Sequence, residues 1–208
     1  MSDTQRHATS FSSFCALMAR PVLMTGLLRD LLTRHFQPGN IEDRDLRKLI
    51  WKDSPDTGIL IETVTRWKPN TTEKRPAVVV KRNAYRNIRL GINDQHQMNP
   101  ADRIGNRHFE TVWTGSHTLF CLGGSGAQAE ILATEVQREL TQFGPAIRQH
   151  LDLKRFAVLD IGAINELEEA TENFVVPVTV GYAYSECWVL DEQAPRFNKL
   201  SLSAILDA

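Results

Sequence analysis

The chain has 208 residues, of which 42% are hydrophobic and 24% are charged. This composition excludes a disordered chain and allows a substantial buried core. No apolar run is long enough to span a bilayer, and the polar N-terminus lacks a secretory pattern. The three cysteines, Cys15, Cys121 and Cys187, are odd in number and far apart, which favours reduced thiols and folding in the cytoplasm.

The first half of the chain predicts one long helix followed by short strands. Apolar residues recur at helical spacing over residues 14–36, where Pro21 is expected to kink the helix or begin its main part. A short helix over 41–51 is weakly indicated. Residues 58–67 read as a strand, with Ile59, Ile61 and Trp67 on one face, and residues 77–81 and 88–92 as a second strand pair. Residues 93–106 are polar and aperiodic.

The second half is more regular. Strands are expected at 109–113 and 117–122, and then a helix from 127 to 143, with Ser125 as N-cap and Gln128 completing a capping box. Gly144-Pro145 is expected to break this helix, with a further turn running to about residue 150. A strand follows at 155–161. The last strand alternates, with Pro177 indicating an edge or a bulge. Its apolar face is predicted to hold Phe174, Val176, Val178, Val180, Tyr182 and Tyr184.

The helix should bury one apolar stripe and point several polar side chains elsewhere. The predicted stripe is Ala129, Leu132, Ala133, Val136, Leu140 and Phe143, and the outward residues are Glu130, Gln137, Arg138 and Glu139. We expect one α+β domain over residues 1–192, with a basic hairpin or loop insertion at 68–107 and a C-terminal tail at 193–208.

Charge is strongly segregated along the chain. Residues 74–107 hold eight basic and two acidic residues, a net charge of +6, whereas residues 109–192 hold four basic and thirteen acidic residues, a net charge of −9. Such poles suit contacts between subunits, or contact between the basic pole and nucleic acid, although plain solvated faces fit as well. The candidate contact residues are Lys81, Arg82, Tyr85, Arg86, Arg89, Arg103 and Arg107.

No recognisable catalytic, cofactor or metal constellation is found in the sequence. Gly124-Ser125-Gly126 follows a strand and opens a helix, as in a dinucleotide fingerprint, but a tight turn and a capped helix explain it equally. The six histidines include no pair at metal-binding spacing with suitable neighbours. No serine or cysteine lies in a nucleophile motif. We therefore expect a protein that is not an enzyme and needs no cofactor.

The order of elements resembles the tail-terminator proteins of long-tailed bacteriophages. The resemblance rests on the helix at 14–36, a β-hairpin region, the strand at 116–122, the helix at 129–136, and the closing strands at 155–161 and 173–190. It implies a mixed, mostly antiparallel sheet with two main helices on one face, to which this chain adds an extended β-arm or loop.

The resemblance also implies a function. Six copies would form a ring that caps the tail tube, stops its polymerisation and joins the tail to the neck. The expected partners are further copies, the tail tube protein, neck or head-completion proteins and viral DNA in the channel, without a membrane. Two alternatives stay open: another neck ring component, such as an adaptor or head-closure protein, and a small nucleotide-binding enzyme using residues 124–126.

Overall fold

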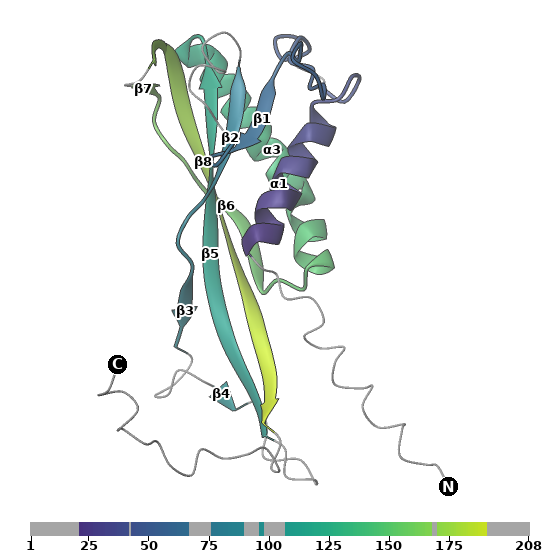
Figure 1. Ribbon diagram of the computed structural model, residues 1–208, viewed down its shortest axis with the longest axis vertical. Coiled ribbons are helices and arrows are strands. Elements are labelled where there is room, and N and C mark those ends of the chain that lie inside the picture. The colour runs from purple at the N-terminus through teal and green to yellow at the C-terminus, as the bar shows by residue number, and fades with distance from the viewer. Residues whose placement is uncertain are drawn as a thin grey trace, which may run out of the picture.

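The computed structural model describes residues 21–41, 43–66, 76–89, 96–97, 107–167 and 170–190. It shows two helices beside one twisted sheet, from which two strands extend as a long arm (Figure 1). The elements are α1 (Pro21–His35), β1 (Leu60–Thr63), β2 (Ala77–Arg82), β3 (Arg86–Ile88), β4 (His96–Gln97), β5 (Arg107–Gly123), α3 (Gly126–His150), β6 (Arg155–Ile161), β7 (Asn165–Leu167) and β8 (Ala170–Leu190).

The sheet has the order β1-β2-β5-β8-β6, with β3 and β4 paired to β5 and β7 paired to β8. Only the β1–β2 pair is parallel, and every other pair is antiparallel. The expected α+β class with a mixed, mostly antiparallel sheet is thus confirmed. Because β5 and β6 both run antiparallel to β8, they are parallel to each other, and β5, α3 and β6 form a split β-α-β unit around β8.

Both helices cover one face of the sheet, as expected. Alternate residues of the three central strands share that face: in β2, β5 and β8 the rows Val78–Cys121–Val176 and Val80–Leu119–Val178 lie against the helices. Leu28 and Leu32 of α1 and Leu132, Val136 and Leu140 of α3 complete this core, all fully buried. Burial of this surface is the main source of the fold's stability.

A buried polar cluster joins the two helices inside this apolar layer. His35 Nε2 lies 2.8 Å from Glu135 Oε1, and His35 Nδ1 lies 3.0 Å from Glu139 Oε2. Arg138 adds a contact of 2.8 Å to Glu135. Burial raises the pKa of the Glu139 carboxyl above its usual range. The prediction that Glu139 points away from the core is therefore wrong, because the histidine of α1 supplies a partner that makes its burial tolerable.

Helix α3 also continues beyond its predicted end. It runs through Gly144-Pro145 to His150, and Ile147 extends the buried stripe in place of Phe143, which is 44% exposed. Proline removes one backbone donor, but the helix continues because its next turn is held against the sheet. Gly144 lies against Phe156 of β6, at a distance where even a Cβ would make only an ordinary contact of 3.5 Å with the ring.

Two strand predictions and one helix prediction differ from the structure. The strands expected at 109–113 and 117–122 are one unbroken strand, β5. The segments 77–81 and 88–92 do not pair with each other, because β2 lies within the sheet between β1 and β5 while β3 pairs with β5 lower down. Residues 44–48 form turns rather than a helix, and Trp67, residues 1–20 and residues 98–106 lie outside the described residues.

Pro177 is neither at an edge strand nor at a bulge of β8. It pairs with Phe120 of β5 on one side, and on the other its carbonyl accepts a hydrogen bond of 2.8 Å from the Gly162 amide, where β6 ends. Its missing N–H therefore falls in the gap between β6 and β7, where no ladder bond is lost. Among the cysteines, Cys121 is a free buried thiol as expected, but Cys187 is disulfide-bonded, which contradicts that expectation.

Candidate functional site: the β-arm and the basic stripe

The β5–β8 ladder has two halves with different surroundings. It is paired in one register from Arg107–Leu190 to Gly123–Phe174. The half nearest α3 lies under the helices. The other half, residues 107–115 and 182–190, forms an arm whose base packs Tyr182 and Tyr184 against α1 and α3 and whose remainder extends past the helices, flanked by β3 and β4 (Figure 1). A ribbon of two or three strands is marginally stable in water. The arm therefore presents backbone and side chains at a distance from the core.

A histidine marks the junction between body and arm. His117 of β5 is fully buried, and its Nε2 lies 2.8 Å from the Thr25 hydroxyl of α1. Because that hydroxyl donates its proton to the Pro21 carbonyl, it accepts from His117, so the ring carries its proton on Nε2. The other nitrogen, Nδ1, is buried without a partner. Burial and the neighbouring Arg82 lower the pKa of His117 to about 4, so the ring is neutral at physiological pH.

Aromatic rings continue from His117 along the helix-side face of the arm. The His117 and Tyr182 ring centroids are 5.6 Å apart, and those of Tyr182 and Tyr184 are 6.4 Å apart in a stacked arrangement. Further along, the Trp113 and Tyr85 rings are 5.5 Å apart, and Trp113 Nε1 donates to Glu186 at 3.0 Å. Burial raises the pKa of Tyr182 to about 12, so its phenol stays protonated. These contacts stiffen the arm near the body.

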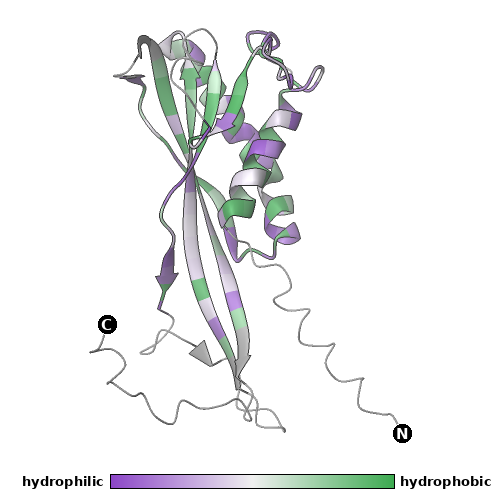
Figure 2. Cartoon of the chain, in the orientation of Figure 1, coloured by the Kyte–Doolittle hydropathy of each residue, from purple (hydrophilic) through white to green (hydrophobic). Residues whose placement is uncertain are grey.

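The opposite face of the same strands is small and polar. Thr118 and Thr179 face each other across β5 and β8, and the Asn83 amide donates to both Ser116 and Thr118. Nearer the tip, the Ser185 hydroxyl donates to Glu110, which also pairs with Lys154 at 3.0 Å. In Figure 2 the sheet beneath the helices is largely green, whereas the arm is mostly pale or purple. The described part of the arm is therefore less apolar than the sheet beneath the helices.

The structure places the predicted contact residues along the β2–β3 side of this arm. The Lys81 amine lies 5.9 Å from the Phe120 ring centroid, and the Arg82 guanidinium lies 5.7 Å from that of Tyr85. Arg86 of β3 pairs with Thr114 of β5. Arg89 follows β3 and is exposed, Arg107 is the first residue of β5, and Arg103 lies outside the described residues.

These basic residues do not converge on one pocket. Arg82 is opposite His117 and Arg86 is opposite Thr114 of β5, and Arg89 follows β3. We call Lys81, Arg82, Arg86 and Arg89 the basic stripe. An extended row of this kind suits a macromolecular surface better than a small molecule. The sequence analysis did not single out His117. Trp113, Gly115 and His117 alternate along β5 and share one face of the sheet, and this alternation would have indicated that the histidine lies at the junction.

The glycine turn before α3 is occupied by its own side chains. Ser125 Oγ accepts from the Gln128 amide at 3.2 Å, and Gln128 Oε1 accepts from the Gly124 amide at 2.9 Å. Gly123 is needed because a Cβ there would lie 2.8 Å from the Ala129 amide nitrogen. Two amides of the turn are thus bound by its own side chains, as in a capping box, which favours a helix cap rather than a phosphate-binding loop.

Within the described residues, no group of three or more His, Cys, Asp or Glu side chains is arranged to hold a metal ion. The same residues contain no helix that is long and apolar enough to cross a membrane. No protein-family model and no curated protein matches the chain. The geometry above is therefore the basis for any functional assignment.

Proposed function

We propose that this chain is a ring-forming structural protein of a bacteriophage virion, the tail terminator that caps the tail tube and joins it to the neck. The arm is the observation that carries the proposal. Beyond its base, where Tyr182 and Tyr184 pack against α1 and α3, it extends past the helices as a ribbon paired to β3 and β4. A thin β-ribbon of this kind gains stability when a neighbouring subunit packs on it.

Charge supports the same assignment. The basic stripe follows one side of the arm, while residues 109–192 carry the excess of acidic residues. A basic surface on one copy and an acidic surface on the next favour head-to-tail association, which produces closed rings when the rotation between copies closes. A hexamer is the stoichiometry that the tail-terminator resemblance implies. The basic stripe then contacts an acidic neighbour or faces DNA in the channel.

The ring is tested by native mass spectrometry and negative-stain microscopy of the purified chain, followed by addition of polymerising tail tube subunits from the same phage. We expect closed rings, and tubes that stop growing with a ring at one end. Reversing Arg86 and Arg89 to Glu should weaken assembly of the ring or of the capped tube, whereas Asp53→Arg, on an exposed loop, should not. Assembly that is unaffected by the reversal contradicts the role of the stripe.

The two alternatives give different results in the same experiments. Another neck ring component, such as an adaptor or a head-closure protein, forms rings but leaves tube growth unchanged. A small nucleotide-binding enzyme stays monomeric and gains thermal stability when a dinucleotide is added. We favour the terminator over the enzyme because the Gly124 and Gln128 amides are already bound by the cap of α3.

A further inference from the structure

The sheet ends in two edges, and exposed apolar side chains gather at both. Strand β1 forms one end of the sheet and β6 the other. Next to β1 lie Val22, Leu23 and Val64, of which Val22 is 68% exposed. Next to β6 lie Leu159, Ile161 and Ile164, of which Leu159 is 52% exposed. Exposed apolar patches of this kind mark surfaces that contact another protein.

The patch beside β1 borders a basic groove, which we call the α1–β1 groove. It lies between the first turns of α1 and the ends of β1 and β2, with a volume of about 680 Å³. Three guanidinium groups line it, those of Arg29, Arg66 and Arg82, against the single carboxylate of Glu62, which pairs with Arg29 at 3.5 Å. Lys81 lines it as well, so among the described residues the groove has a net charge of +3 beside an apolar rim.

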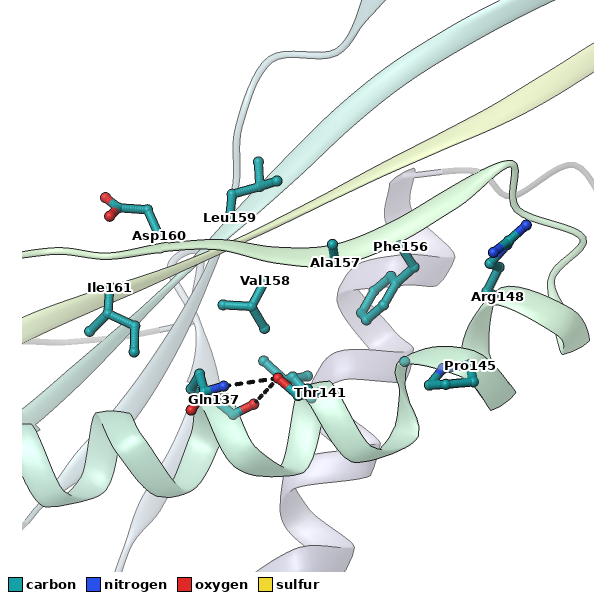
Figure 3. Close-up of a pocket in the computed structure, with 12 residues that line it drawn as sticks. Gln137, Thr141, Pro145, Arg148, Phe156, Ala157, Val158, Leu159, Asp160 and Ile161 are labelled. Atoms are coloured by element: carbon teal, nitrogen blue, oxygen red, sulfur yellow. Dashed lines mark hydrogen bonds between the residues drawn. The ribbon is translucent and has the colours of Figure 1, made fainter.

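The other edge has the opposite charge. Residues 155–166 contain Asp160 and Glu166 against Arg155, a net charge of −1, and all three side chains belong to exposed residues. We call this segment, with its apolar side chains, the β6 edge. Figure 3 shows Ile161 directed toward α3, while Leu159 and Asp160 point to the other side of the strand. The register of β6 shifts between Val158 and Asp160, a bulge that discourages continuous strand addition at this edge.

We propose that the β6 edge of one copy docks by its side chains into the α1–β1 groove of the next copy. Each surface combines exposed apolar side chains with charge of the opposite sign to the other, and the two lie at opposite ends of one sheet. A contact between them is head-to-tail, so each copy uses both surfaces and the assembly closes as a ring or grows as a filament. This inference rests on the proposed ring assembly and names the surfaces that form it.

Charge reversal on each surface tests the pairing. Asp160→Arg changes the net charge of the β6 edge from −1 to +1, and Arg66→Glu lowers that of the groove from +3 to +1, so either variant alone weakens the attraction between copies and should dissociate at concentrations at least roughly tenfold higher than the wild type. An equal mixture of the two variants restores opposite charges at positions 66 and 160 of every interface if the copies alternate. The double variant Arg66→Glu/Asp160→Arg restores them within one chain. Glu130→Arg, on the exposed side of α3, is the matched control and should assemble normally.

Sedimentation velocity of each variant, of the mixture and of the double variant supplies the measurement, with circular dichroism to check that each chain is folded. Rescue in the mixture and in the double variant supports the docking, because misfolding is not repaired by mixing. If the wild type forms rings and the charge-reversal variants assemble equally well, the docking is overturned but the proposed ring is not. Rescue into open filaments supports the docking but overturns the capping ring. A wild-type chain that stays monomeric at every concentration overturns both.

Discussion

Acidification should loosen the junction between the body and the arm through His117. The ring is neutral and buried in the folded protein with a pKa of about 4, whereas the unfolded chain has the ordinary value of 6.5. Between these two values the unfolded state binds a proton that the folded state does not. His117 therefore contributes stability that is present above pH 6.5 and is lost as the pH falls through the folded value. The difference between the two pKa values corresponds to about 3 kcal/mol in total.

The assay is urea unfolding of the wild type and of His117→Gln at a series of pH values. Glutamine keeps a donor that can reach Thr25 but does not titrate, so subtracting the two profiles removes the contribution of every other group. The free-energy advantage of the wild type over the variant should shrink by about 2 kcal/mol between about pH 7 and pH 5. A difference that stays constant over this range refutes a neutral, buried histidine at the junction.

Three further substitutions probe the body. His35→Leu leaves Glu139 facing a second buried carboxylate and should lower the free energy of unfolding by about 3–5 kcal/mol, and adding Glu139→Gln should recover part of that loss in urea unfolding. Gly58→Ala should lower the free energy of unfolding by about 1–3 kcal/mol, because its Cβ would lie 2.7 Å from the Lys48 carbonyl oxygen. Gly26→Ala, whose Cβ meets nothing within 4 Å, should raise it by about 0.5–1 kcal/mol. Equal melting temperatures for the two variants would contradict this reasoning. Ser125→Ala should cost about 1 kcal/mol by removing the N-cap, while Ser125→Asp should retain most of the stability in thermal melts.

Patterns that depend on one element were predictable from the sequence. The start of α3 at Ser125 follows from a local cap, and the apolar face of β8 follows from strict alternation. The sequence predicts two strands with Gly115 between them, because the contact that requires a glycine there is made with a residue far away in the chain. A Cβ at Gly115 would lie 2.7 Å from the Tyr182 hydroxyl oxygen, so glycine is needed for close packing inside one continuous strand.

The remaining errors also come from contacts between distant segments. Glu139 reads as a surface residue until His35, about a hundred residues earlier, is placed beside it. Pro145 reads as a helix end until the burial of Ile147 against the body is known. The candidate contact residues were found by composition, but their arrangement as a stripe depends on the pairing of β3 with β5, which residues 86–88 alone do not encode.

The unbroken β5–β8 ladder restricts how related sequences can change in length. Because one register joins the arm to the core, an insertion in β5 alone would shift the alternation and turn core side chains such as Leu119 outward. A longer or shorter arm therefore requires equal changes at two sites, one near residue 110 and one near residue 187. Natural variants should show such paired insertions and deletions, and the reach of the arm would then evolve in steps of about 3.4 Å per residue pair.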